Sequence, residues 1–183
     1  LTIQVPFVFD TLPCVQNDSL VTQIIAKTAE EIDTLAFIQA EQVIEGGLAG
    51  PNIVPVLDPK HLECLELLGS NNRFIELSNW NLDAYTRIKA SNSNMLVSVV
   101  LEFKNGWMDE FKEMLSAGVV IFHLKSDLHG RSSNGIFMMD LMKEAHMYLV
   151  EIGIRDKISL IGSGGISAAD HLPKAIICGA DAV

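Results

Sequence analysis

Short apolar runs alternate with amphipathic stretches along the whole chain. The apolar runs have strand length and are rich in Val, Ile and Leu, and they predict seven strands at residues 3–9, 34–38, 53–57, 73–77, 95–103, 118–124 and 158–161. Between them, apolar side chains recur at helical spacing, which predicts helices from Asp18 or Ser19 to Ile32, over 58–69, from Leu82 through Ile88, over 107–116 and 136–152, and from Ser167 onward. Alternation of strand and helix is the pattern of a parallel sheet.

The number of repeats favours a (β/α)8 barrel over an open sheet of five or six strands. After the seventh strand, residues 179–183 (GADAV) read as the beginning of an eighth. A typical barrel has ~250 residues and a small one ~200. A chain of 183 residues therefore predicts a compact or truncated barrel, and we expect the chain to be a fragment of a longer protein. No linker divides the chain, which predicts a single domain over 1–183. A doubly wound sheet is the alternative, but its GxGxxG fingerprint fails because Gly162-Ser163-Gly164-Gly165-Ile166-Ser167 ends in serine.

The glycines after the seventh strand are the strongest candidate for a ligand site. Ser163, Gly164 and Gly165 follow a buried strand and precede a predicted helix. Paired glycines let backbone N–H groups approach a ligand closely, and a helix start favours a phosphate. Barrels place their phosphate site after strands seven and eight. The competing interpretation is that the glycines only make a tight turn between strand and helix.

Composition narrows the class of protein further. The chain is 49% hydrophobic with a mean hydropathy of +0.28, yet no apolar run reaches the roughly 18 residues of a membrane span. A net charge of -10 argues against nucleic acid or an anionic membrane as the main partner. Cys14, Cys64 and Cys178 lie far apart, so they signal neither zinc nor an iron–sulfur cluster. A sparse, odd count suits a reducing compartment and predicts a cytoplasmic protein.

The polar loop after the sixth strand supplies the candidate catalytic residues. Lys125, His129 and Arg131 lie in the segment KSDLHGRSSNG, at the end of a strand where a barrel faces its substrate. Taken one by one, each of them is more simply a solvated loop residue, whereas their grouping favours a functional role. His146 lies inside an amphipathic helix and is interpreted as structural.

Residues 158–183, with the pattern ISLI-x-SGGI followed by KA and GADAV, resemble the FMN-binding central domain of the glutamate synthase family. The preceding helix, residues 137–156, is similar to that family as well. The resemblance implies an FMN-dependent (β/α)8 oxidoreductase in which Ser163, Gly164 and Gly165 hold the FMN phosphate. Gly179 and Ala180 match the approach to a second phosphate loop. No metal ligand is implied within this chain.

The family reaction makes glutamate from 2-oxoglutarate and glutamine-derived ammonia, so the resemblance implies a small-molecule substrate. Iron–sulfur clusters and a glutaminase would belong to absent sequence or to partner subunits, and the chain would be an oligomer or part of a larger complex. On this reading Lys125 or Arg131 stabilises the negative charge of a reduced flavin, and His129 moves a proton.

Two departures from the family keep other functions open. Val100 stands where the family usually carries a lysine near the flavin, and residues 127–131 (DLHGR) replace a Gly-Thr-Gly segment. A non-catalytic scaffold barrel is therefore one alternative. The SGG and GAD pattern is also shared with inosine monophosphate dehydrogenase and other barrels, so a barrel acting on a nucleotide or sugar phosphate is another.

Overall fold

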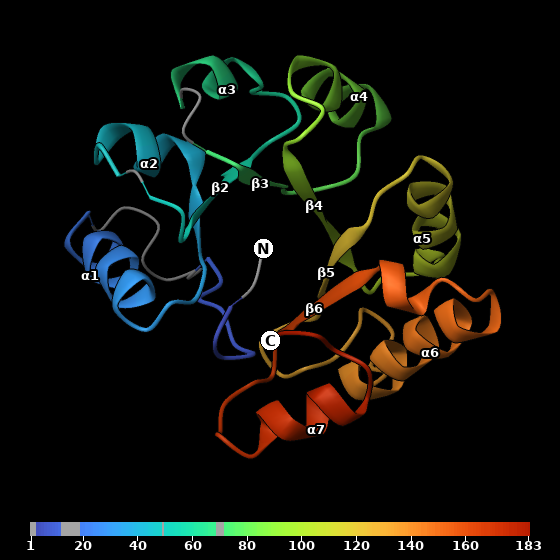
Figure 1. Cartoon of the computed structure of the whole chain (residues 1–183). Helices are drawn as coiled ribbons and strands as arrows, with labels where there is room; N and C mark the ends of the chain where they lie inside the picture. Colours follow the sequence, from blue (N-terminus) through green and yellow to red (C-terminus); the bar gives the residue numbers. More distant parts are fainter. Residues whose placement is uncertain (1–2, 12–18, 49, 69–71) are drawn as a thin grey trace. The chain divides into compact units, whose positions relative to one another are not determined.

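The computed structural model describes residues 3–11, 19–48, 50–68 and 72–183, and the chain divides into two compact units, Leu1–Val97 and Ser98–Val183. In each unit, parallel strands alternate with helices along the chain (Figure 1). Such alternation follows from the sequence, because strands that are buried on both faces read as continuous apolar runs while the helices need only one apolar stripe.

The first unit is built on three parallel strands in chain order. Its elements are α1 (Ser19–Glu31), β1 (Ala36–Gln39), α2 (Ala40–Glu45), β2 (Ile53–Leu57), α3 (Glu63–Leu67), β3 (Phe74–Leu77) and α4 (Leu82–Ser91). Phe9 forms a parallel bridge with Ala36, so the predicted first strand is reduced to a single bridge. Apolar side chains of α1, β1, α2 and β2 form the core of this unit: Ala26, Ala29, Ala36, Ile38, Val43 and Ile53.

The second unit contains every residue of the candidate site. Its elements are β4 (Leu96–Glu102), which begins at the end of the first unit, α5 (Trp107–Ser116), β5 (Ile121–Lys125), α6 (Met138–Glu151), the 3-10 turn η1 (Arg155–Lys157), β6 (Ser159–Ser163) and α7 (His171–Ile177). β5 pairs in parallel with β4 on one side and with β6 on the other. Ala182 forms a parallel bridge with Ile161, so the predicted eighth strand does begin to pair at the end of the chain.

Alternate side chains of β5 and β6 face opposite ways, and one of the two faces is covered by helices. The rings of Phe122 and Phe111 of α5 lie 4.6 Å apart, and a Cβ added to Gly162 would lie 2.7 Å from Met142 of α6. Because side chains alternate along a strand, the residues between these positions point to the opposite face. We call that opposite side the inner face; Lys125 and Ser163 both lie on it.

Several predicted boundaries hold and others do not. The strand over 53–57 and the helix over 107–116 are found as predicted. The helix predicted over 58–69 spans only Glu63–Leu67, and its predicted end at Gly69 lies outside the described residues. None of the helices in the described ranges is both long and apolar enough to cross a membrane.

The prediction that a helix starts near Ser167 is wrong, and this changes the argument for the site. α7 begins at His171 and has seven residues. Gly164 and Gly165 take φ values of +100° and +70°, which break regular structure, and the Ser167 N–H donates to His171 Nδ1 at 3.3 Å instead of opening a helix. A helix dipole next to the glycines therefore contributes nothing to anion binding, and only the backbone and side chains of the turn remain.

Candidate functional site

The carboxyl ends of β4, β5 and β6 bring three polar side chains into one row on the inner face. Lys125 pairs in register with Glu102 on one side and with Ser163 on the other. Below them, the next row consists of Val100, His123 and Ile161, all of them buried. In these two rows, the charged side chains Glu102 and Lys125 thus lie at the carboxyl end of the strands, where barrels hold their substrates.

Ser163 presents a buried hydroxyl without a partner. Its residue is 7% exposed, and within the described part of the chain its Oγ makes no hydrogen bond. The carbonyl of the same residue is satisfied, because it accepts from the backbone N–H of Ser126 at 2.9 Å and from Ser126 Oγ at 3.0 Å. Buried polar groups in folded proteins almost always have a partner, so an orphaned hydroxyl indicates a place where a ligand or water completes the structure.

Gly164 and Gly165 lie tightly against the loop that follows β5. A Cβ on Gly164 would overlap Ser126 Oγ and lie 2.5 Å from the carbonyl oxygen of Asp127. A Cβ on Gly165 would lie 2.5 Å from Gly130 Cα and 2.7 Å from Gly130 N. The tight-turn interpretation therefore accounts for the choice of glycine at both positions.

That close packing leaves the backbone donors of the glycine turn available. Among the described residues, the N–H groups of Gly164 and Gly165 donate no hydrogen bond within the chain. His171 lies behind them: its Nδ1 accepts from the Ser167 N–H and lies 3.1 Å from the Gly165 carbonyl oxygen. Two unused N–H groups beside an unpartnered hydroxyl form a set of donors suited to an anion.

The loop after β5 is an ordered turn held together by Asp127. Asp127 Oδ1 accepts from the backbone N–H groups of His129 at 2.9 Å and of Arg131 at 2.8 Å. The Asp127 N–H donates to the Arg131 carbonyl at 2.9 Å, and the Gly130 N–H donates to the Asp127 carbonyl at 3.0 Å. The side chains of His129 and Arg131 are exposed, and Arg131 Nη1 donates to the carbonyl of Gly135 at 2.7 Å.

A cavity of about 330 Å³ opens beside this loop, entirely within the second unit. Its charged lining residues are Glu102, Lys104, Lys125, Asp127 and Arg131, with the hydroxyls of Ser126, Ser132 and Ser133 between them. Lys104 is already paired, with its Nζ 3.2 Å from Glu110 Oε2. The structure thus brings Lys125 and Arg131 to one cavity, whereas His129 does not line it. The volume is that of a small-molecule pocket.

Gly179 and Ala180 lie at the opposite end of β6 from the glycine turn. The residue after them, Asp181, donates its N–H to the Leu160 carbonyl at 2.8 Å and accepts from the Leu160 N–H at 2.8 Å. Leu160 precedes Ser163 by three residues, or about 10 Å along a strand. The structure therefore does not bring Gly179 and Ala180 together with Ser163, because they lead into the eighth strand and do not follow it.

Arg155 fixes this far end of the sheet. Its guanidinium donates to the carbonyls of Ile158 at 2.7 Å and Gly179 at 2.8 Å, and pairs with Asp181 at 3.0 Å. Its Nε donates to His146 Nδ1 at 3.0 Å. The structural role predicted for His146 agrees with this bond. A Cβ at Gly179 would lie 2.5 Å from His146 Cβ, so Gly179 is needed for packing here.

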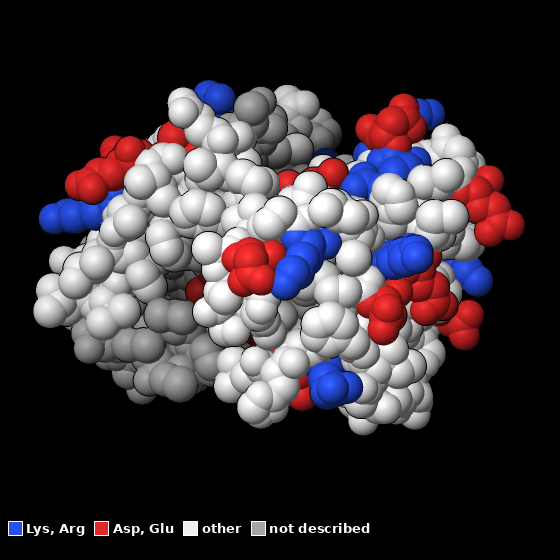
Figure 2. Space-filling view, turned by 90° about the horizontal axis from the view of Figure 1, so that it is seen from below, with Lys and Arg blue, Asp and Glu red and all other residues white. Residues whose placement is uncertain are grey.

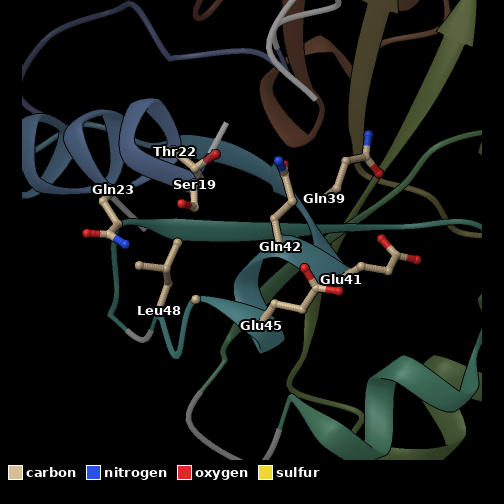
Figure 3. A pocket seen from close by; sticks show the side chains of 9 residues that line it. Ser19, Thr22, Gln23, Gln39, Glu41, Gln42, Glu45 and Leu48 are labelled. Carbon is tan, nitrogen blue, oxygen red and sulfur yellow. The ribbon is translucent and has the colours of Figure 1, made fainter. Parts of the chain in front are cut away.

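A second cavity, of about 960 Å³, lies in the first unit and was not anticipated from the sequence. Figure 3 shows its lining side chains, which come from α1, the end of β1, α2 and the segment after α2: Ser19, Thr22, Gln23, Gln39, Glu41, Gln42, Glu45 and Leu48. Glu41 and Glu45 are the charged groups among them. None of the predicted site residues lines this cavity.

Charges on the surface are mixed in sign. On the face shown in Figure 2, acidic and basic side chains lie next to one another at several places. Lys174, which follows the glycine turn by nine residues, is exposed and pairs with Asp170 at 2.6 Å. Its ammonium hydrogen bond lowers the pKa of the Asp170 carboxyl below its ordinary value. Lys174 is thus engaged in a surface ion pair.

Comparison with known proteins supports both the fold and the resemblance. A family model described as the conserved region in glutamate synthase matches residues 126–183, which span the loop after β5, α6, β6 and α7. The resemblance predicted for the last third of the chain is confirmed by this match, and it supports FMN as the cofactor. Comparison with curated proteins gives no match.

Solved structures of flavocytochrome b2 share the fold. A mutant with benzoylformate aligns with a TM-score of 0.71 at 14% identity, over 99% of this chain and 56% of that chain. The recombinant flavin-binding domain of the baker's yeast protein aligns with a TM-score of 0.63 at 16% identity, over 99% of this chain and 57% of that chain. The fold class is therefore a truncated (β/α)8 barrel, in agreement with the compact or truncated barrel that the sequence predicts, and the chain spans just over half the length of these structures.

Proposed function

We propose that this chain is the FMN-binding barrel module of an oxidoreductase, with the FMN phosphate held at Ser163, Gly164 and Gly165. The observation that carries the proposal is the buried Ser163 Oγ, which has no hydrogen-bond partner in the described part of the chain. A phosphate oxygen would accept from this hydroxyl and from the two glycine N–H groups. The match of residues 126–183 to the glutamate synthase region supports the choice of FMN.

Lys125 is the proposed positive charge near the flavin. Val100 occupies the family's lysine position, and it is buried on the inner face beside His123. Lys125 lies one row further toward the carboxyl end, next to Ser163. When bound, FMN supplies the exchange of a hydride or electrons with a substrate. Lys125 would stabilise negative charge there, Arg131 would orient the substrate from the shared cavity, and His129 would hold a proton at its imidazole.

Glutamate formation from 2-oxoglutarate and ammonia is the finer form of this proposal. The family match supports it, and so do the cationic groups of Lys125 and Arg131 in one cavity, because a dicarboxylate needs such groups. Iron–sulfur clusters and a glutaminase would come from partner domains, and the sparse cysteines support a reducing, cytoplasmic setting. A scaffold barrel without catalysis is the second candidate, and the buried Val100 is the observation that favours it.

The test compares FMN with riboflavin, which lacks the phosphate. Purified chain is titrated with each ligand while flavin fluorescence is followed, and the visible spectrum shows any flavin retained through purification. We expect FMN to bind at least about tenfold more tightly than riboflavin. The FMN phosphate accepts several charge-assisted hydrogen bonds at this turn, and riboflavin, which lacks the phosphate, forms none of them. A chain that takes up no FMN, or that binds both ligands equally, contradicts the proposal.

A reduction experiment separates the two candidates. FMN-loaded chain is reduced with dithionite under anaerobic conditions and then mixed with 2-oxoglutarate and ammonia. Reoxidation of the flavin together with formation of glutamate supports the enzymatic proposal. Bound flavin that stays reduced with these substrates supports a scaffold or a different substrate.

A further inference from the structure

We infer that Asp127 is a positioning residue that sets the shape of the phosphate-binding turn from the neighbouring loop. The inference rests on the proposed function, because the ligand of that turn is taken to be FMN. Asp127 lies on the loop after β5, whereas Gly164 and Gly165 follow β6. Asp127 is exposed and lines the cavity beside this loop, and its carboxylate accepts hydrogen bonds from two backbone N–H groups of the turn.

The hydrogen bonds of Asp127 close the turn over 127–131 from both sides. One carboxylate oxygen, Oδ1, accepts both the His129 N–H at 2.9 Å and the Arg131 N–H at 2.8 Å. The backbone N–H and carbonyl of Asp127 bond Arg131 and Gly130 at 2.9 and 3.0 Å. Short polar side chains commonly hold turns in this way, by accepting from N–H groups a few residues ahead. Without the carboxylate, two of these four bonds are lost.

This turn is the wall against which the glycines pack. A Cβ added to Gly164 would lie 2.5 Å from the Asp127 carbonyl oxygen, and a Cβ added to Gly165 would lie 2.5 Å from Gly130 Cα. The Gly130 carbonyl accepts from the Met138 N–H at 2.8 Å, which ties the turn to the start of α6. A looser turn over 127–131 therefore frees Gly164 and Gly165, and their N–H groups are no longer held in fixed positions.

Because Asp127 Oδ1 alone accepts both N–H groups, the inference predicts different results for an asparagine and an alanine at this position. An asparagine at position 127 keeps one carbonyl oxygen that accepts both N–H groups, so the turn keeps its shape. An alanine removes the acceptor. The charge acts in the opposite direction, because a carboxylate near the site repels a phosphate. Positioning thus predicts that Asp127→Asn binds FMN as tightly as the natural chain or more tightly, while Asp127→Ala binds it more weakly.

The experiment titrates the full chain with FMN in four forms: the natural chain, Asp127→Ala, Asp127→Asn and the control Asp156→Asn. Asp156 is an exposed carboxylate of the same unit, on η1. We expect about a tenfold weaker FMN affinity for Asp127→Ala, the size of one or two lost hydrogen bonds to the organised turn, and a change of less than about twofold for the control. Amide hydrogen exchange at His129 and Arg131 should become faster in Asp127→Ala alone.

The outcomes separate this inference from the proposed function. If the natural chain takes up no FMN, the proposed function fails and the inference fails with it. If the natural chain binds FMN and Asp127→Ala binds it equally well, only the inference is overturned. Tighter binding by both Asp127 variants would show that the carboxylate acts only through its charge, and this also overturns it. Weaker binding by both, with equally fast exchange at His129 and Arg131, would show that an amide cannot replace the carboxylate, and again overturns it.

Discussion

Replacing Gly165 by alanine should destabilise the chain far more than the same change at Gly153. The two glycines have almost the same φ value, +70° and +73°, in the left-handed region. They differ in their surroundings. A Cβ at Gly165 would lie 2.5 Å from Gly130 Cα and 2.7 Å from Gly130 N, whereas a Cβ at Gly153 would meet nothing within 4 Å. Gly153 is therefore a matched control for the conformational cost.

The magnitude follows from two contributions. A left-handed conformation costs a residue with a Cβ about 1–2 kcal/mol, and both variants share this cost. At Gly165 the collision adds about 1–3 kcal/mol, as for other overpacked sites. The colliding atoms belong to backbone, so no side-chain rotation relieves the contact. We expect Gly153→Ala to lower the free energy of unfolding by about 1–2 kcal/mol and Gly165→Ala by about 2–5 kcal/mol.

Urea unfolding of both variants, followed by circular dichroism without FMN, measures the difference. The same samples are then titrated with FMN. Gly165→Ala should lose most of its FMN affinity, since the turn must move away from Gly130, while Gly153→Ala should keep it. Equal losses of stability in the two variants would refute the close approach of the two loops. Unchanged FMN binding by Gly165→Ala would refute the assignment of the phosphate to this turn.

Three further predictions concern other groups. Ser163→Ala should weaken FMN binding about tenfold without lowering the free energy of unfolding of the FMN-free chain, because the hydroxyl it removes is buried without a hydrogen bond; a parallel loss in urea unfolding would contradict this. Arg155→Ala should lower the free energy of unfolding by about 2–4 kcal/mol, because the guanidinium bonds two carbonyls and a carboxylate of other segments; the exposed Lys157→Ala is the control, and similar values for the two would argue against the network. The pKa of His61 should lie above its ordinary value because Glu63 hydrogen-bonds the ring at 3.0 Å. The stability contributed by this pair is then present below the ordinary pKa of His61 and is lost as pH rises through the raised one. NMR titration of the ring should show the pKa falling in Glu63→Gln, and no change would rule the pair out.

Much of the fold follows from local pattern. The strand over 53–57 and the helix over 107–116 were predicted with their bounds, because each is a continuous apolar run or a clear amphipathic stripe. The prediction of a helix from Ser167 is wrong for a reason that the local pattern of apolar residues does not contain. Two glycines with positive φ and a bond from the Ser167 N–H to His171 hold the chain in turns up to Asp170, and the glycines pack against the loop after β5.

The candidate site, too, was predicted only in part from local sequence pattern. The sequence by itself determined the alternation of strands and helices, the position of the glycine turn after a buried strand, and the resemblance of residues 158–183 to an FMN-binding segment. Only the tertiary structure decided that Lys125 pairs in register with Ser163, that Asp127 shapes the adjoining turn, and that Gly179 and Ala180 lie at the other end of β6. The physical reason is that local periodicity fixes which residues form an element, whereas strand register and hydrogen bonds between distant loops fix which side chains meet.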